Sequence, residues 1–307
     1  MQTTSRLLMI RPSEFAFNVQ TAASNVFQKA PLANEQVHEQ VLREFDRFVA
    51  LLRDNKVLIL VVDDDPEQDT PDAIFPNNWI STHEDGTLII YPVEAENRRA
   101  ERRMDIVKAI QNGYRFKHFV DLSFFELSGK FLEGTGSMVL DRDFSIAYAS
   151  ISTRTHPDVL NYAANLLNYD TVTFHATDHT GRPIYHTNVI TCIGRGFALV
   201  CLEAIHDEKE RSTFLSSLIE TNKEIIPVSL DQMNHFAANI LQIENTEGES
   251  LIVMSSGAYS ALTETQHSAL TRYGKIIHSP LTTIERIGGG SARCMIAEIH
   301  PPKTTLL

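Results

Sequence analysis

The chain has little cysteine and no long apolar run, and both absences restrict what it can be. Its three cysteines, Cys192, Cys201 and Cys294, have neither the number nor the spacing of a disulfide framework or a zinc site. No apolar run approaches the roughly 20 residues of a membrane-spanning helix, and the first residues lack the pattern of a secretory signal. We therefore expect a cytoplasmic protein with no membrane partner and no metal or organic cofactor.

Basic residues are also scarce. Lys and Arg number 27 against 39 Asp and Glu, which gives a formal net charge of −12 at pH 7. Binding to a nucleic-acid backbone needs a basic footprint, so nucleic acid is not expected as a partner. The sequence also lacks low-complexity tracts and obvious linkers, and its 43% hydrophobic content is enough for a substantial core. We expect one domain over residues 1–307.

Strand-turn-strand patterns recur along the chain. Four segments, beginning near residues 77, 136, 186 and 235, run through a β-rich stretch, a tight turn and a second apolar stretch. The closing segment GSARCMIAEIH offers one more strand. Helical periodicity fills the intervals, over residues 34–55, 96–111, 157–167, 208–221 and 263–273. Because a short apolar strand follows these helical segments, the repeating unit is β-β-α-β.

The residues at or just before the first strand of each unit recur regularly. They are Asn78, Glu133, His186, Asn239 and Cys294, separated by 55, 53, 53 and 55 residues, and Asn18 precedes the first of them by 60. Such a period is typical of stacked or radial repeats, and in a closed ring the matching strand ends point at one axis. The repeat therefore predicts a ring with these side chains gathered at its centre.

Three of these central residues have complementary chemistry. Three glycines, residues 288–290, let the backbone turn steeply before Cys294, since glycine takes positive φ freely. A thiolate is a nucleophile, a histidine is a general acid and base near neutral pH, and a carboxylate orients the imidazole or the substrate. Cys294, His186 and Glu133 therefore form a candidate catalytic set. Free cysteine is more often a small buried hydrophobe, and we expect that structural role for Cys192 and Cys201.

Four motifs resemble those of the guanidine-modifying, or pentein, superfamily, and they occur in that superfamily's order: FPNNW, FLEGTGSMVLDR, YHTNV and GGGSARCM. The superfamily includes arginine deiminases, dimethylarginine dimethylaminohydrolases and succinylarginine dihydrolases. The resemblance implies a five-bladed pseudosymmetric α/β propeller of ββαβ units, which agrees with the repeat. It also implies that Cys294 is the nucleophile, His186 the acid and base, and Glu133 the carboxylate that binds the substrate.

Acidic positions of the superfamily's motifs are changed in this chain. Members that act on guanidinium usually have Asp at the position of Asn78, often Asp at that of Asn188, and Glu-Gly-Gly-Asp where this chain has EGTGS. A guanidinium offers only donors and is costly to bury without carboxylates, whereas a ureido group also has a carbonyl acceptor that asparagine can meet. We therefore expect a hydrolase of the ureido C–N bonds of citrulline that yields ornithine, ammonia and carbon dioxide through a covalent cysteine intermediate.

Further binding residues are predicted from their charge and from their position within the repeating unit. Arg154 lies in SISTRT, which resembles a motif whose arginine holds a carboxylate, so it is the first choice for the substrate's α-carboxylate, with Arg11 second. Asn18 and Asn239 share the phase of the central residues and either line the site or bracket strands. Arg293 is expected to point away from the site, because it is the neighbour of the nucleophile.

Other interpretations stay open. The charged stretch over residues 94–105 alternates in sign and is expected to be a solvated helical face. An arginine or dimethylarginine hydrolase or dihydrolase of the same superfamily would use the same catalytic set, and dihydrolases also have Asn in the first motif. A cysteine amide hydrolase acting on peptides and a non-catalytic propeller scaffold are alternatives from other classes. The favoured interpretation predicts a small-molecule substrate and leaves a homo-oligomer open.

Overall fold

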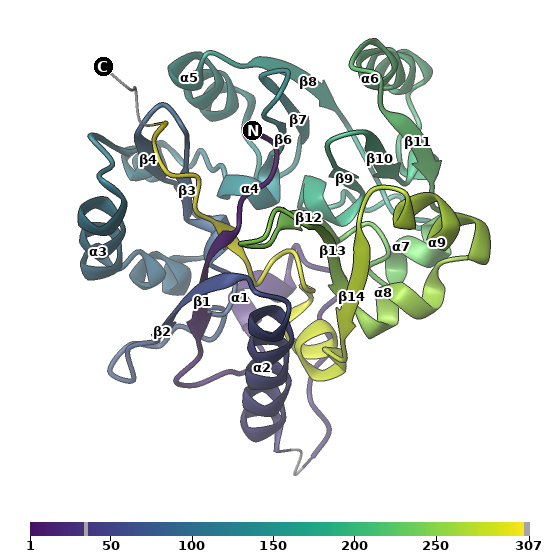
Figure 1. Ribbon diagram of the computed structural model, residues 1–307. Helices are drawn as coiled ribbons and strands as arrows, with labels where there is room; N and C mark the ends of the chain where they lie inside the picture. The colour runs from purple at the N-terminus through teal and green to yellow at the C-terminus, as the bar shows by residue number, and fades with distance from the viewer. Residues whose placement is uncertain (34–35, 304–307) are drawn as a thin grey trace.

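Five small β-sheets surround a common centre, with the longer helices on the outside of the ring (Figure 1). The computed structural model describes residues 1–33 and 36–303. Each sheet has three strands. Within these described residues, no helix is both long and apolar enough to span a bilayer.

The sheets share one topology, in which the first strand is antiparallel to the middle strand and the middle strand is parallel to the third. Four sheets follow one another along the chain: β3 (Ile80–Thr82), β4 (Thr87–Ile90) and β5 (His118–Asp121); β6 (Val139–Asp141), β7 (Ile146–Ser150) and β8 (Asp170–Phe174); β9 (Thr191–Ile193), β10 (Phe197–Val200) and β11 (Glu224–Pro227); β12 (Leu241–Glu244), β13 (Ser250–Ser255) and β14 (Lys275–Ser279).

The fifth sheet closes the ring by joining the two ends of the chain. It consists of β15 (Ala297–Glu298), β1 (Arg6–Arg11) and β2 (Leu58–Asp63). The last strand pairs with the first, and Leu8 lies opposite Ala297. This arrangement confirms the predicted five-bladed α/β propeller of ββαβ units, and it shows that one blade is split between the two ends of the chain.

Four of the five predicted helical segments agree closely with the crossover helices. The crossover helices are α2 (Val37–Asp54), α3 (Met104–Tyr114), α5 (Pro157–Leu167), α6 (Glu208–Glu220), and the pair α8 (Ser256–Ala261) and α9 (Glu264–Thr271). The predicted start of the first helix, at residues 34–35, lies outside the described residues. Helix α2 buries Val41, Phe45, Phe48 and Leu52, which recur at helical spacing. Burying each such side chain contributes about 1.5–3 kcal/mol, so this face fixes the helix to its blade.

The segment predicted as one helix over residues 96–111 is divided. It begins as the 3₁₀-helix η2 (Glu96–Glu101) and becomes α-helical only in α3. The remaining short elements connect blades or lead into them: α1 (Val19–Ala22), η1 (Pro76–Asn78), η3 (Ser123–Ser128), α4 (Gly134–Ser137), η4 (Thr187–Val189), η5 (Leu202–Ala204), α7 (Leu230–Asn234) and the π-helical turn η6 (Ile284–Gly288).

The residues predicted to share one phase do lead into the five blades, with one exception. Asn78, Glu133, His186, Asn239 and Cys294 each precede the first strand of a sheet. Asn18 instead caps α1, after the middle strand of the split blade, so its predicted phase is wrong. The physical reason is that the ring closes. Five blades have five positions just before a first strand, and in the split blade Cys294 occupies that position, because the first strand of this blade is β15.

Candidate active site

Glu133 and His186 form a buried pair at the centre of the ring. Glu133 is fully buried and His186 is 2% exposed, and Nε2 of the imidazole lies 2.8 Å from Oε2 of the carboxylate. The backbone N–H of Glu133 donates to the Arg154 carbonyl and to Ser137 Oγ, which fixes the start of α4. Gly134 follows with a φ of +47°, and a Cβ there would lie 2.3 Å from the Asn77 carbonyl oxygen. Only glycine fits this close approach.

Cys294 follows the glycine turn and contacts two asparagine amides. Its Sγ lies 3.3 Å from Nδ2 of Asn239 and 3.6 Å from Nδ2 of Asn188, and the side chain is 3% exposed. Asn239 also donates to the backbone carbonyl of Asn188, at 2.9 Å, which holds the two amides together. Gly289 has a φ of +63°, so the turn before the cysteine does need glycine.

The sulfur and the imidazole border one cavity, so they are on the same face of the ring. Its lining comprises Thr21, Asn25, Asp72, Phe75, Asn78, Arg98, Arg154, Tyr185, His186, Gly288, Gly289, Gly290 and Cys294. The cavity has a volume of about 10 Å³. Because a single water needs about 10–15 Å³, an amino acid enters only if part of this lining moves. Thr21 and Asn25 come from the segment of residues 18–25, which we call the strap.

Arg154 lies in the cavity wall and is bound to the strap. Its Nη2 donates to the Thr21 carbonyl at 2.9 Å and to Ser24 Oγ at 2.8 Å, and its Nη1 lies 3.4 Å from Glu133 Oε2. The guanidinium also stacks over the Tyr185 ring at 4.8 Å. The arginine expected to bind a carboxylate is therefore in the site, with its donors occupied by protein groups that a substrate would have to replace.

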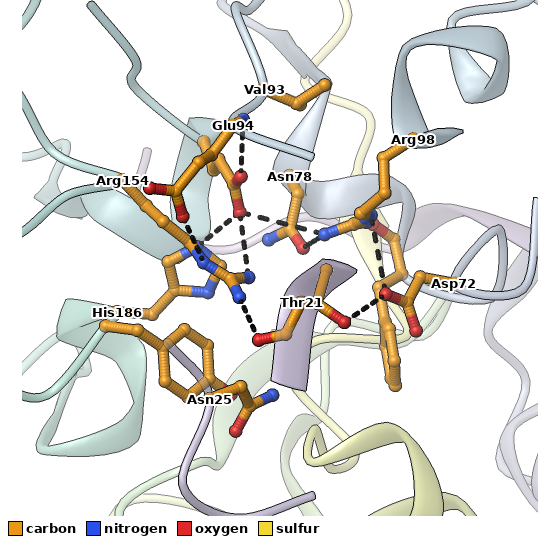
Figure 2. A network of polar contacts seen from close by, with 12 residues as sticks. Thr21, Asn25, Asp72, Asn78, Val93, Glu94, Arg98, Arg154 and His186 are labelled. Atoms are coloured by element: carbon orange, nitrogen blue, oxygen red, sulfur yellow. Dashed lines mark hydrogen bonds and ion pairs between the residues drawn. The ribbon is translucent and has the colours of Figure 1, made fainter. Parts of the chain in front are cut away.

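Asp72 and Arg98 are site residues that the sequence analysis missed. Asp72 Oδ2 accepts hydrogen bonds from Asn18 Nδ2 and Thr21 Oγ1, while its buried Oδ1 has no partner among the described residues. Arg98 donates to Asn78 Oδ1 at 2.9 Å. Figure 2 shows Thr21 bound by Asp72 on one side and by Arg154 on the other, with Arg98 next to Asp72 and Asn78. Asn18 therefore supports Asp72 and does not itself line the cavity.

The predicted solvated face over residues 94–105 is wrong in part. Arg98 is 2% exposed and Glu101 is 3% exposed, and the guanidinium donates two hydrogen bonds to the carboxylate, at 2.8 and 2.9 Å. Two opposite charges three residues apart give the same sequence pattern whether they lie on a solvated helical face or form a buried bidentate ion pair. Nothing in the local sequence distinguishes the two, and the turn into the 3₁₀-helix η2 directs this pair inward.

Electrostatics set the protonation states of the central groups. Burial raises the pKa of Glu133, but Arg154 and the hydrogen bond from His186 outweigh it and hold that pKa well below its usual range. Burial lowers the pKa of His186 to about 4 despite the nearby carboxylate, and burial raises the pKa of the Cys294 thiol. Near neutral pH the site therefore holds a carboxylate, a neutral imidazole and a thiol.

Other residues singled out in the sequence lie away from the catalytic cavity. Arg11 forms an exposed ion pair with Asp46, on the outside of the ring, so it is not a site residue. Arg293 pairs with Glu298 at 3.1 Å and points away from the cavity, as expected. Burial raises the pKa of Cys192 to about 12 and that of Cys201 to about 11, which agrees with structural roles.

A closed ring of five ββαβ blades with a central cysteine, histidine and glutamate is the arrangement of the pentein guanidine-modifying superfamily. Within it, the family model for eukaryotic N,N dimethylarginine dimethylhydrolase matches residues 11–301, so the chain belongs to this family. The match spans all five blades. No curated protein sequence matches the chain.

Solved structures that share the fold include three relatives with low sequence identity. The N-terminal domain of ArgZ bound to product, an arginine dihydrolase from the ornithine-ammonia cycle in cyanobacteria, has a TM-score of 0.75 and 18% identity, over 97% of this chain and 98% of that one. AgrE in complex with L-arginine has a TM-score of 0.75 and 18% identity, over 98% and 41%. A dimethylarginine dimethylaminohydrolase adduct with S-methyl-L-thiocitrulline has a TM-score of 0.65 and 15% identity, over 96% of this chain and 99% of that one. The chain spans about two-fifths of full-length ArgZ and AgrE, and these likenesses show the fold.

Proposed function

We propose that the protein hydrolyses the ureido group of citrulline to ornithine, ammonia and carbon dioxide. The observation that carries this proposal is the surroundings of the nucleophilic sulfur. Among the described residues, every side-chain hydrogen-bond contact of Cys294 Sγ is with an asparagine amide, from Asn188 or Asn239. An amide presents both a donor and an acceptor, which matches the N–H and C=O groups of a ureido substrate.

The carboxylate nearest the reaction is already neutralised. Glu133 Oε2 bonds to His186 and lies 3.4 Å from Arg154 Nη1 and 3.7 Å from Arg98 Nη1. A guanidinium brought to Cys294 would face this partly cationic environment, and the side-chain groups in contact with the sulfur among the described residues are amides, which carry no negative charge. Because a buried cation is stable only when it is paired, the arrangement favours a neutral group.

The same geometry gives each central residue a role. Since ionised Glu133 can only accept, the imidazole Nε2 carries the proton of their hydrogen bond, and Nδ1 is left as the base. His186 removes the thiol proton, Cys294 Sγ attacks the ureido carbon, and the proton then leaves with ammonia. A thiocarbamate remains on the sulfur. Water activated by His186 cleaves it to N-carboxyornithine, which loses carbon dioxide to give ornithine.

The amino-acid end of the substrate has complementary groups in the cavity wall. Asp72 Oδ1 is buried and unpartnered among the described residues, and it is placed to accept from an α-ammonium group. We expect Arg154 to bind the α-carboxylate once that group replaces the Thr21 carbonyl and the Ser24 hydroxyl as acceptors of its hydrogen bonds. Arg98 and Asn78 hold each other and thereby shape the wall between these two ends.

A second candidate is hydrolysis of the guanidino group of arginine or dimethylarginine. It is favoured by the family model and by the fold relatives, which are described as an arginine dihydrolase, as AgrE in complex with L-arginine and as a dimethylarginine dimethylaminohydrolase. The catalytic roles of Cys294, His186 and Glu133 would be the same. The difference would lie in how the site neutralises a permanent positive charge next to the sulfur.

One assay separates these candidates. Purified protein is incubated separately with citrulline, arginine and dimethylarginine, and ornithine, citrulline and ammonia are quantified, with Cys294→Ser as the blank. We expect ornithine and ammonia from citrulline and no product from arginine. Citrulline formed from arginine or dimethylarginine, with citrulline itself unreactive, would establish the second candidate. Absence of product from all three would leave the non-catalytic scaffold as the better interpretation.

A further inference from the structure

A second small cavity lies at the centre of the ring, and we call it the axial chamber. Its walls come from the first strands of four blades, β6, β9, β12 and β15, together with the N-terminal segment and the turns before the strands. Its lining comprises Gln2, Thr135, Val139, Leu140, Arg142, Asn188, Thr191, Cys192, Ile193, Ile240, Leu241, Arg293 and Glu298. The volume is about 30 Å³, enough for one or two waters and too small for an amino acid.

Gln2 forms a fixed wall of the axial chamber. Its Nε2 donates to the carbonyls of Leu140 and Ile193, both at 2.9 Å, and its Oε1 accepts from the backbone N–H of Arg142 at 2.7 Å. The amide is thereby bound to strands of two blades. Because the Gln2 amide forms its hydrogen bonds with backbone groups, it closes the chamber without needing a hydrogen bond from a molecule bound inside.

Thr191 gives the axial chamber an unmet polar group. Thr191 is one of the residues that line the chamber, it is 1% exposed, and its Oγ1 has no hydrogen-bond partner among the described residues. Leaving a buried hydroxyl unbonded costs about 1–3 kcal/mol. A water in the chamber would remove that cost, since buried waters bind where the protein offers otherwise unsatisfied polar atoms.

The axial chamber lies next to the catalytic groups, and no residue of the strap lines it. Asn188 lines the chamber, and its amide contacts Cys294 Sγ, which lines the catalytic cavity. Thr135 also lines the chamber, and the next residue, Gly136, lies against the imidazole: a Cβ there would be 2.8 Å from His186 Nδ1. The chamber is thus separated from the sulfur and the base by the width of one residue.

We propose that the axial chamber binds the water that hydrolyses the covalent intermediate, an inference that rests on the proposed function. After ammonia has left, this water passes Asn188 and its oxygen attacks the carbonyl carbon on Cys294 Sγ. One water proton goes to His186 Nδ1, the C–S bond breaks, and its electron pair returns to the sulfur. The carboxylated amine is released on the side of the strap. With this supply the strap stays closed over the intermediate, and the catalytic cavity of about 10 Å³ need not admit water beside the substrate.

The test uses Thr191→Leu, which fills the axial chamber, and Thr191→Val, which removes only the hydroxyl. p-Nitrophenyl acetate acetylates the cysteine, releasing p-nitrophenol, and water then cleaves the acetyl thioester to acetate. We expect the initial burst to stay within about twofold of wild type, while thioester hydrolysis slows about tenfold in Thr191→Leu and less in Thr191→Val. Intact-protein mass spectrometry follows the adduct, and Cys294→Ser supplies the background.

The matched control is Thr177→Val. Thr177 also has a buried hydroxyl without a partner among the described residues, but it does not line the axial chamber, so both steps should remain at the wild-type rate. Wild-type hydrolysis rates in both Thr191 variants, or an equal slowing of the burst and the hydrolysis, would overturn the proposal. If Thr191→Leu does not fold, Thr191→Val and a crystal structure decide: a water bonded to Thr191 Oγ1 is expected in wild type only. Since this assay needs no citrulline, failure of the proposed function would appear separately, as lack of turnover of the three amino acids.

Discussion

His186 Nε2 and Glu133 Oε2 lie 2.8 Å apart in the centre of the ring, although 53 residues separate them along the chain. Both side chains are buried, and two arginines, Arg98 and Arg154, approach the same carboxylate oxygen. The carboxylate therefore has two tasks: it fixes the imidazole tautomer and it balances buried positive charge. These tasks can be separated by experiment.

Replacing Glu133 by Gln should impair both tasks. The amide removes the negative charge that Arg98 and Arg154 face, and breaking a buried ion pair from one side costs about 3–5 kcal/mol. It also no longer fixes the tautomer of His186, so we expect kcat to fall by about 10²–10⁴-fold. Thermal unfolding and steady-state kinetics measure the two effects. Glu203→Gln is a control, because Glu203 lies outside the catalytic cavity.

The pKa of His186 predicts the acid limb of the activity profile. Burial lowers this pKa to about 4, so the imidazole of the free enzyme remains an unprotonated base across the weakly acidic range. We expect kcat/KM to fall as the pH drops towards about 4, well below the ordinary histidine pKa near 6.5. An acid limb centred near 6.5 in the pH profile of kcat/KM would contradict this.

The same shift predicts how stability changes with pH. Because the folded-state pKa of His186 lies below the unfolded value, the unfolded chain binds the proton more readily. The contribution to stability is present above about 6.5 and is lost as the pH falls towards about 4. Burial and Arg142 also lower the pKa of His300 to about 4, so the loss is shared between these groups. Denaturant titrations at pH 7 and pH 5 should give a smaller difference for His186→Asn than for wild type.

The repeat made the central residues visible in the sequence, whereas the rest of the site had no such signal. Cys294, His186 and Glu133 lead into blades at equivalent positions, so periodicity alone brought them together. Asp72 and Arg98 lie in connections between elements and share no period with them. Their burial follows from how the strap and η2 fold over the ring, which depends on contacts between distant segments. The predicted position of Asn18 is wrong because the chain begins with β1, the middle strand of the split blade, so the first repeat at the N-terminus has no first strand for Asn18 to precede.

Asn188→Asp tests why amides surround the sulfur. A carboxylate beside Cys294 would pair with a guanidinium and repel a ureido oxygen, so the ratio of kcat/KM for arginine to that for citrulline should rise by at least about tenfold. Asn161→Asp on the exposed face of α5 makes the same charge change away from the site and should leave the ratio unaltered. An unchanged ratio in Asn188→Asp would show that this amide does not select the substrate.

Asp72→Asn tests the binding of the α-ammonium group. A hydrogen bond to a charged group is worth about 1.5–3 kcal/mol, which corresponds to a rise in KM of about 10- to 150-fold with a smaller change in kcat. A substrate analogue that lacks the amine should show no such difference between wild type and variant. Asp64→Asn is the matched control, because Asp64 is also buried and accepts from Thr70 outside the cavity.

Gly136→Ala tests how closely the base is packed. A Cβ at this position would lie 2.5 Å from Asn78 Nδ2 and 2.8 Å from His186 Nδ1, so the imidazole or the amide must shift. A displacement of about 1 Å in a catalytic group costs on the order of 10²-fold in rate, and we expect a loss of that size in kcat. Gly113→Ala in helix α3 is the matched control. Nothing lies within 4 Å of a Cβ there, so activity should be unchanged and stability should rise by about 0.5–1 kcal/mol. Equal activity of the two variants would mean that His186 is not held against α4 during catalysis.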